Sequence, residues 1–398
     1  MSPFLVGHAT HPDWRAALAL VAAQIEGRMA QHEASTAGPL TLGFVYITDI
    51  YAPHAAALYA ALQQRWPRLS WVGSVGVGVA ASGVEYFDEP ALVVMLAALP
   101  SGHFEVFSGA RPISRIEPFA ALVHADPETP DLAELIGEMS DRTDSGYLFG
   151  GLAASRAGSF HIADGVWRGG LSGVAFSSDV NLVSRVTQGC QPIGAVRRIT
   201  RAERNLVVEL DGQPALPCLL SDLKIDNLGD LQQALPRLRS TLVGLADASD
   251  PLLARAGQFG TDTRVRHLLG LDPARQGVAV GEMVQPGMAL AFCTRDVAAA
   301  RRDLVRICAE IREEVESRER VADGVPSTPA APGRIAGAVY VSCSGRGGPH
   351  FGGPSAELQI VQHALGDVPL VGFFAAGEIA RHHLYGYTGV LTVFTEAS

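Results

Sequence analysis

The chain has 398 residues, of which 31 are basic and 41 acidic, so its formal net charge is −10, and 47% of the residues are hydrophobic. This length suffices for two domains with buried cores. The acidic balance disfavours nucleic acid and anionic membranes as partners, because both attract cationic surfaces. Five widely spaced cysteines without a C-x-x-C pair argue against a disulfide framework and a structural zinc site.

The first residues lack the charged and apolar segments of a secretory signal peptide. Every stretch of 18 residues along the chain contains a charge, a proline or polar residues, so no membrane span is predicted. We therefore expect a cytoplasmic protein.

The predicted elements begin with a helix over 13–32, whose apolar residues recur at helical spacing. A strand–helix–strand–strand unit follows, with a second unit of the same order near the C-terminus. The first has strands over 40–47, 69–75 and 91–98 and a helix over 53–66; the second has strands over 335–342, 368–374 and 388–394 and a helix over 354–366. The strand starts are 29 and 33 residues apart, then 22 and 20, which indicates an internal duplication.

A weaker third copy is predicted in the middle of the chain, with a helix over 128–139 and strands over 147–152 and 171–176. Beyond it, strands over 193–200 and 205–210 end at the turn pair Asp211-Gly212. The pattern changes near residue 215, where we place the boundary between two domains, 1–215 and 216–398.

A long amphipathic helix over 298–320 and a Pro/Gly/Ala-rich linker over 323–333 precede the last unit. Strand–helix–strand order favours parallel pairing, and the strand-rich middle favours antiparallel pairing. The predicted fold class is α/β, or α+β, with mixed β-sheets flanked by helices in two domains.

Several segments, taken in order, resemble the FIST family, a sensory module found in bacteria, archaea and F-box proteins. They are Gly150-Gly151, Leu171–Phe176, Gly189–Gly194, Thr200, Glu209–Ala215, Gly281–Asp296, Cys343–Gly347, Glu357 and Gly372–Ile379. The resemblance covers most of the chain and identifies the predicted domains as FIST N-like and FIST C-like.

The resemblance implies a bacterial signal-transduction protein that binds a small ligand, such as an amino acid or another small anion. It also implies a signalling partner in trans, such as a histidine kinase. Some stand-alone members of the family are haem proteins that sense nitric oxide, so noncovalent haem is an alternative. Haem needs one axial side chain, which the sequence does not choose among the twelve histidines.

The predicted ligand site is the glycine-rich turn that follows the strand over 335–342. Backbone N–H groups at a helix N-terminus, together with the guanidinium of Arg346, suit an anion such as a carboxylate. The predicted ligand-binding residues are Cys343, Ser344, Arg346, Gly347, Glu357, Gly377, Glu378, Asp49 and Ser74. The alternative interpretation of the turn is structural, with Arg346 paired to Glu357 on the surface.

Glu378 follows a strand end, where open α/β sheets bind ligands, so its carboxylate is predicted to hold an amino group opposite Arg346. A structural pair of Glu378 with Arg346 or with the backbone is the alternative. Asp49 and Ser74 occupy the corresponding places in the first copy. If the halves pack with pseudo-symmetry, these two residues face the same pocket.

Cys343 also allows a third hypothesis, a cysteine-dependent hydrolase or transferase, since a thiolate at a helix N-terminus is activated. His350 or His382 would then act as the base. We predict no enzyme, because nothing in the sequence orients either histidine and a buried cysteine is common as a small apolar residue. No catalytic set and no metal-ligand set is predicted.

Overall fold

The computed structural model describes residues 3–33, 38–225, 231–248, 253–255, 258–260, 263–322 and 334–396. Its chain divides into two compact units. The first comprises Met1–Thr187 and Arg301–Ser398, and the second comprises Gln188–Ala300. The linker predicted over 323–333 lies outside the described residues. Among the described helices, none combines the length and the apolar character that crossing a membrane requires.

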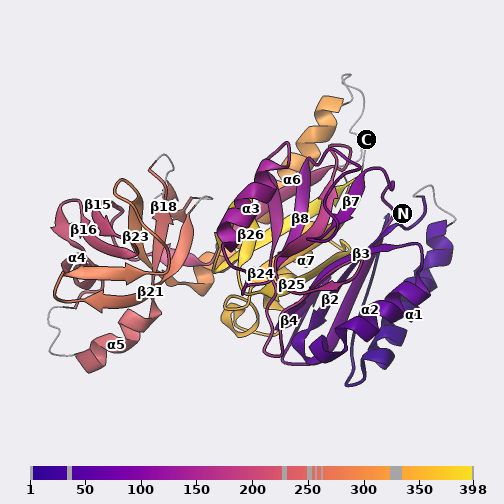
Figure 1. Ribbon diagram of the computed structural model, residues 1–398, viewed down its shortest axis with the longest axis horizontal. Helices are drawn as coiled ribbons and strands as arrows, with labels where there is room; N and C mark the ends of the chain where they lie inside the picture. The colour runs from indigo at the N-terminus through magenta and orange to yellow at the C-terminus, as the bar shows by residue number, and fades with distance from the viewer. Residues whose placement is uncertain are drawn as a thin grey trace. The chain divides into compact units, whose positions relative to one another are not determined.

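Among its described residues, the first unit contains three six-stranded sheets with one common pattern (Figure 1). The first sheet consists, in spatial order, of β1 (Phe4–Thr10), β6 (Ala91–Ala97), β2 (Leu42–Thr48), β3 (Ser70–Gly76), β10 (His161–Ala163) and β11 (Val166–Trp167). The second consists of β7 (Phe104–Phe107), β12 (Leu171–Phe176), β8 (Ala120–Ala125), β9 (Tyr147–Leu152), β26 (Glu378–Ala380) and β27 (His383–Tyr385). The third consists of β13 (Leu182–Gln188), β28 (Thr388–Thr395), β24 (Ile335–Cys343), β25 (Leu370–Ala375), β4 (Gly78–Ala81) and β5 (Val84–Phe87).

The central two strands of each sheet are parallel, and both strands beside them are antiparallel. Each hairpin joins the sheet of another repeat. The hairpin β4–β5 follows β3 but pairs with β25, β10–β11 follows β9 but pairs with β3, and β26–β27 follows β25 but pairs with β9. The predicted duplication is confirmed, and the middle copy completes a threefold repeat.

One glycine at the same register position marks each repeat. A Cβ on Gly73, Gly150 or Gly372 would lie 1.7–1.9 Å from the carbonyl oxygen of its parallel neighbour. The neighbours are Val45, Val123 and Tyr340. Each central strand pair is therefore packed too closely to admit a side chain there.

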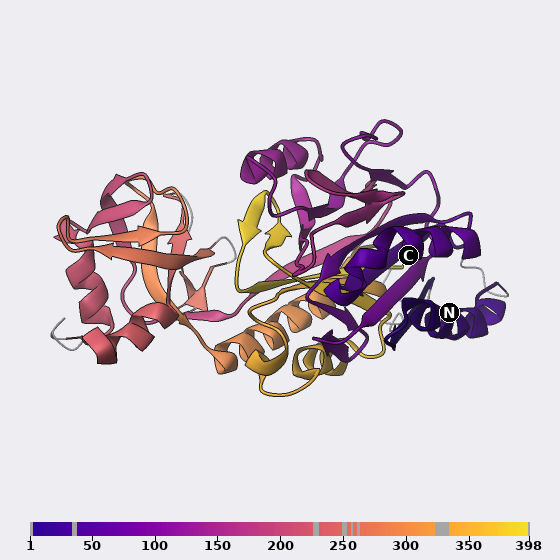
Figure 2. The same ribbon diagram turned by 60° about the horizontal axis from the view of Figure 1, so that its bottom comes forward.

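One apolar core lies between the three sheets and takes residues from all of them, including Phe44, Phe149 and Phe373. Helices cover the outer faces (Figure 2). α1 (Trp14–Glu33) and α2 (Ala55–Arg65) pack on the first sheet, α3 (Leu132–Asp141) on the second, and α7 (Ala356–Leu365) over β24 of the third, with α6 (Val297–Ala322) beside α7. Short 3₁₀ turns, η1 (Asp49–His54) and η3 (Gly348–Phe351), follow β2 and β24.

The second unit is an antiparallel barrel. Its ring closes because β18 (Thr241–Ala246) pairs with both β21 (Arg264–Asp272) and β23 (Ala289–Arg295). The ring continues through β22 (Gly277–Val280), β16 (Leu206–Leu210) and β15 (Arg197–Glu203). Added to it are β14 (Cys190–Pro192), β17 (Gln213–Pro214), β19 (Leu253–Arg255), β20 (Gln258–Phe259), α4 (Ala215–Asp222) and α5 (Leu231–Ser240).

The strand predicted over 205–210 corresponds to β16, and the predicted turn Asp211-Gly212 follows it and connects it to β17. The strand predicted over 193–200 lies further along the chain, at Arg197–Glu203, and a turn at Arg204 and Asn205, with Arg204 at φ 57°, joins it to β16. The strand β1, which precedes the first helix, was not predicted. The domain boundary at residue 215 stays a prediction, and the compact units divide the chain at other positions.

The close approach at Gly372 predicts a large loss of stability for Gly372→Ala. The added methyl group meets the Tyr340 carbonyl at 1.7 Å and forces the strands apart, so we expect a cost of about 2–4 kcal/mol. All four tryptophans, Trp14, Trp66, Trp71 and Trp167, belong to the first unit, so their fluorescence in a urea titration reports its unfolding. Gly137→Ala, in α3 with open space around its Cβ position, is the matched control and should be neutral or stabilising. Equal stabilities of the two variants would contradict the close packing.

Candidate functional site

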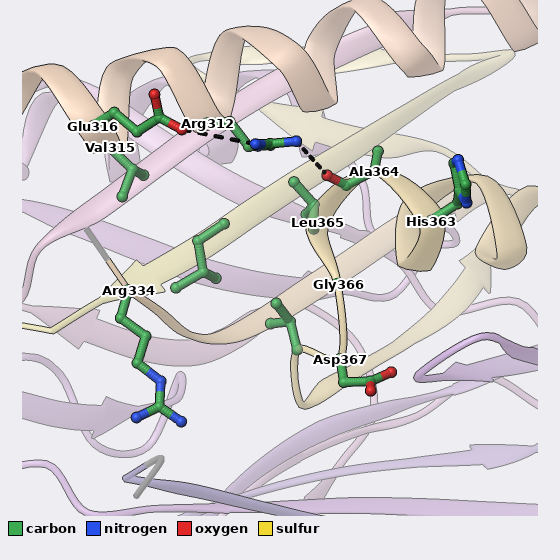
Figure 3. Close-up of a pocket in the computed structure, with 11 residues that line it drawn as sticks. Arg312, Val315, Glu316, Arg334, His363, Ala364, Leu365, Gly366 and Asp367 are labelled. Carbon is green, nitrogen blue, oxygen red and sulfur yellow. Dashed lines mark hydrogen bonds and ion pairs between the residues drawn. The ribbon is translucent and has the colours of Figure 1, made fainter. Parts of the chain in front are cut away.

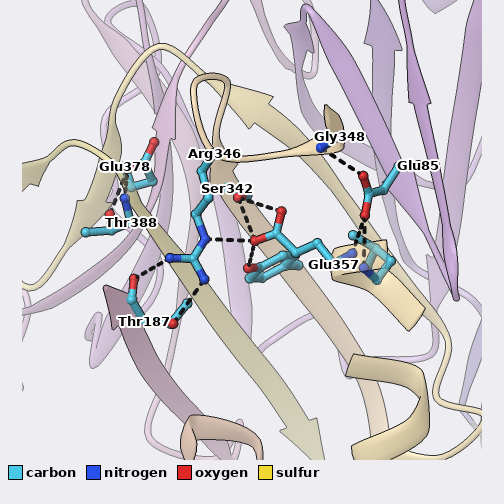
Figure 4. A network of polar contacts seen from close by, with 10 residues as sticks. Glu85, Thr187, Ser342, Arg346, Gly348, Glu357, Glu378 and Thr388 are labelled. Carbon is cyan, nitrogen blue, oxygen red and sulfur yellow. Dashed lines mark hydrogen bonds and ion pairs between the residues drawn. The ribbon is translucent and has the colours of Figure 1, made fainter. Parts of the chain in front are cut away.

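The guanidinium of Arg346 is buried beneath the glycine-rich loop, with 1% of its side chain exposed (Figure 4). Its Nε donates to Oε1 of Glu357 at 2.9 Å, and Glu357 is fully buried. The hydroxyl of Tyr340 donates to the same carboxylate at 2.6 Å, and that of Ser342 at 3.1 and 3.2 Å. The sequence alternative of an Arg346–Glu357 pair is therefore what the structure contains, in the interior and not on the surface.

The other guanidinium nitrogens of Arg346 contact Thr187, the residue after which the chain leaves the first unit. Nη2 donates to the Thr187 hydroxyl at 3.1 Å, and Nη1 lies 3.5 Å from the Thr187 carbonyl oxygen. The guanidinium carbon also lies 5.2 Å from the ring centroid of Phe351, a cation–π contact. A buried cation needs such partners, since removing it from water unpaired costs several kcal/mol. These contacts make Arg346 a structural cation.

Glu85 binds the start of α7 from a hairpin that belongs to another repeat. Its carboxylate accepts hydrogen bonds from the backbone N–H groups of Glu357 at 2.9 Å and Leu358 at 3.0 Å, and from Gly348 at 3.2 Å. The residue before the helix, Ser355, makes no capping bond to α7, so Glu85 satisfies the free N–H groups. Burial, together with the nearby charge of Glu357, raises the pKa of Glu85 to about 7.

Glu378 begins β26 and is fully buried. The backbone N–H and the hydroxyl of Thr388 donate to its Oε2 at 3.1 and 2.7 Å, whereas Oε1 has no hydrogen-bond partner among the described residues. Burial raises the pKa of Glu378 to about 8, although Thr388 and the charge of Arg346 work in the opposite direction. At neutral pH this carboxyl group is therefore mostly protonated.

Cys343 ends β24 and lies beside Glu378. Burial and the neighbouring Glu378 raise the pKa of the Cys343 thiol to about 12, and the nearby thiol in turn acts to lower the pKa of the Glu378 carboxyl. The side chain is buried. A protonated, buried thiol is a poor nucleophile, because the thiolate is the reactive form.

The remaining predicted residues of the loop have backbone roles. The N–H of Ser344 donates to the Ala375 carbonyl at 2.9 Å, and the Gly377 carbonyl accepts from Leu152 at 2.8 Å. At Gly347, a Cβ would lie 2.1 Å from the Phe374 ring, so the loop needs glycine there.

Asp49 and Ser74, predicted from the first copy, have partners elsewhere. Asp49 accepts two hydrogen bonds from the guanidinium of Arg156, at 2.7 and 3.0 Å, and Ser74 donates towards the backbone carbonyls of Val75 and Phe160. Within the described part of the chain, neither side chain bonds to Arg346, Glu357 or Glu378. Their role in a shared pocket stays a prediction.

The structure thus groups seven of the nine predicted residues in or around one loop, namely Cys343, Ser344, Arg346, Gly347, Glu357, Gly377 and Glu378. Sequence analysis missed Glu85, Thr187, Tyr340 and Thr388, because each reaches the loop from a distant segment or from inside a strand. One signal was available in the sequence. Tyr340 and Ser342, two residues apart, lie on one face of β24, and the acidic residue Glu357 follows on the next helix.

A surface pocket of about 500 Å³ lies between α6, α7 and the start of β24 (Figure 3). Arg312, on its edge, already contacts the Ala364 carbonyl and Glu316. Another pocket, of about 340 Å³, is lined by Met29, Leu40 and Trp66 with nearby arginines. Neither contains any of the nine predicted ligand-binding residues.

Comparison with known proteins identifies the class of protein that this fold and sequence represent. Residues 41–213 match the FIST N domain and residues 215–381 match the FIST C domain. The chain belongs to the FIST family, whose domains are associated with sensing and signal transduction.

Similar full-length relatives occur in mycobacteria. The chain is 30% identical over 423 residues to the uncharacterized protein Rv0628c of Mycobacterium tuberculosis, covering 98% of this chain and 99% of the relative. It is 31% identical over 410 residues to the uncharacterized protein Mb0898c of Mycobacterium bovis, covering 98% of each. These matches support the family but name no ligand.

The buried ion pair predicts that Arg346→Ala destabilises the first unit by about 3–5 kcal/mol, because Glu357 is left charged without its partner. Arg65→Ala, which breaks a bidentate pair with Glu26 at the exposed surface, is the control and should cost no more than about 1 kcal/mol. Urea titrations followed by tryptophan fluorescence measure both. A similar small cost for both variants would show that Arg346 is not a structural cation.

The raised pKa of Glu378 predicts a specific pH dependence. Between its ordinary pKa of 4.5 and about 8, the unfolded chain has lost this proton while the folded chain retains it, so stability falls as pH rises. The free energy of unfolding of the wild type, minus that of Glu378→Gln, should therefore fall by about 1.4 kcal/mol per pH unit between pH 5.5 and 7.5. Glu85 titrates in both proteins and cancels in the difference. A difference that is flat across this range would show that Glu378 is ionised in the folded state.

Proposed function

We propose that this FIST protein is a sensory protein that binds a small ligand through the carboxyl group of Glu378. The observation that supports this proposal is the buried Oε1 atom, which has no hydrogen-bond partner among the described residues. Buried polar atoms are nearly always paired, and leaving one unpaired costs about 1–3 kcal/mol. A ligand that supplies a donor recovers this cost. Glu378 also follows the carboxyl end of β25, where sheets with parallel strands bind ligands.

The surroundings of Glu378 favour a small ligand with an amino group. An ammonium group replaces the proton that the carboxyl holds at neutral pH and brings its own N–H donors. An amino acid fits this description through its amino end. Arg346 is already paired with Glu357, which argues against a small anion as the ligand and requires another partner for an amino acid's carboxylate.

The signalling role of the family supports a protein partner as the receiver of the signal. We extend the proposal to a partner in trans, such as a histidine kinase or another signalling protein. The acidic surface charge favours a protein partner over nucleic acid or an anionic membrane.

Binding without catalysis is the proposed activity, and the chemistry of Cys343 supports it. A cysteine hydrolase or transferase needs a thiolate near neutral pH, whereas the pKa of this thiol is about 12. The protonated, buried thiol suits a place in the lining of a binding site beside Glu378.

A haem centre fits His124 poorly. His124 has a ring nitrogen, Nδ1, without a partner among the described residues, but its other nitrogen contacts the Tyr46 hydroxyl. The rings of Tyr46 and Phe373 pack against it at centroid distances of 5.5 and 5.6 Å. A macrocycle bound to His124 would have to displace this core packing.

Small amines test the proposed ligand chemistry. Methylammonium, ethanolamine and glycinamide should raise the melting temperature of the wild type in a saturable manner, and a ligand at 100 times its Kd adds about 2.7 kcal/mol. Glu378→Gln should weaken the response at least tenfold, since the amide cannot neutralise an ammonium group. Tetramethylammonium, which lacks N–H donors, and Glu313→Gln, at an exposed site on α6, are the controls. Equal responses of Glu378→Gln and the wild type, or no response to any amine, would overturn the proposal.

A further inference from the structure

The glycine-rich loop Cys343–Phe351 contacts both segments that connect the two units. The chain leaves the first unit after Thr187 and returns to it at Arg301. We propose that this loop couples the ligand site at Glu378 to both connections, so that ligand binding changes how firmly they are held. This inference rests on the proposed function, because Glu378 is taken as the place where the ligand binds.

The outgoing connection is held by Arg346. The Thr187 side chain is fully buried, and its hydroxyl and carbonyl both face the guanidinium, at 3.1 and 3.5 Å. The next residue, Gln188, ends β13 and already belongs to the second unit. One buried cation therefore fixes the strand at the last residue before it leaves the first unit.

The returning connection is held by the far end of the same loop. The guanidinium of Arg301 donates a hydrogen bond to the carbonyl oxygen of Phe351. Arg301 lies in α6, whose first residues belong to the second unit. The Phe351 ring also packs against the guanidinium of Arg346, so the two connections share one support.

The loop is in turn linked to the ligand site. The backbone N–H groups of Arg346 and Gly347 both donate to the Cys343 carbonyl, at 2.8 and 3.2 Å. Cys343 pairs with Ala375 of β25, three residues before Glu378, and the Ser344 N–H donates to the Ala375 carbonyl at 2.9 Å. The charge of Arg346 also acts on the Glu378 carboxyl group. Loss of the Glu378 proton, or an ammonium group placed beside the carboxyl, therefore changes the electrostatic potential at the guanidinium of Arg346. This change alters the strength of the hydrogen bond from Arg346 to Thr187.

Hydrogen–deuterium exchange of the full-length protein tests the coupling. Thr187→Val keeps the shape of the side chain and removes the hydroxyl that Arg346 binds, so amides at 186–190 should exchange at least threefold faster than in the wild type. Amides of β2 and β3 should not change. Thr143→Val is the matched control, because Thr143 is also buried and loses one hydrogen bond, to the Ser140 carbonyl at 2.8 Å, in the turn after α3. Unchanged exchange in Thr187→Val, relative to Thr143→Val, would overturn the proposal.

The second part of the exchange experiment adds methylammonium as the ligand. In the wild type it should change the exchange rate at 186–190 and at 297–303 by at least twofold, and Thr187→Val should lose that change while keeping the rise in melting temperature. A rise in melting temperature without any change at these amides would reject the coupling and leave the proposed function intact. If neither methylammonium, ethanolamine nor glycinamide raises the wild-type melting temperature, the proposed function fails. The ligand-free comparison of Thr187→Val with Thr143→Val then still decides whether the loop holds the outgoing connection.

Discussion

The burial of one positive charge, the guanidinium of Arg346, organises the candidate site. Such a charge must be paired and hydrogen-bonded in the interior, because its desolvation is not otherwise compensated. Glu357 from α7 and Thr187 from β13 supply the partners, and Phe351 covers the guanidinium. The helix, the strand and the loop are thereby fixed around one point. Glu378 is the acidic residue of this site whose Oε1 atom has no hydrogen-bond partner among the described residues.

The threefold repeat explains why this site draws on distant parts of the chain. Each repeat contributes its hairpin to the sheet of another repeat, so residues that are close in space are far apart in sequence. Glu85 lies on β5 and accepts hydrogen bonds from the first N–H groups of α7, a helix that follows some 270 positions later in the chain. Glu378 arrives on β26 and lies in the second sheet, paired with Gly151 of β9. The exchange of hairpins also ties the three sheets together, since none of them is complete without another repeat.

Local patterns in the sequence were enough to predict most elements and the duplication, because strand and helix periodicity are short-range signals. The same patterns led to the loop Cys343–Gly347 and to Glu357 and Glu378 as polar residues near it. Periodicity could not show that hairpins are exchanged between repeats, so Glu85 was missed. It also could not decide whether Arg346 was free for a ligand. The answer depends on which groups are buried together, and in the structure the carboxylate of Glu357 accepts a hydrogen bond from the guanidinium of Arg346. The barrel of the second unit was not predicted, because closure depends on β18 meeting β23 across about fifty residues.

The proposed ligand site requires that Arg346 be paired within the protein and that the carboxyl of Glu378 be largely protonated at neutral pH. The most direct test is a titration of the Glu378 side-chain carboxyl by ¹³C NMR, with its resonance assigned by its absence from Glu378→Gln. A midpoint near pH 8, shifted to lower pH by methylammonium, is the result expected from burial and from the unpartnered oxygen. A midpoint near 4.5 would mean that the carboxyl is solvated or fully paired, and would contradict the account.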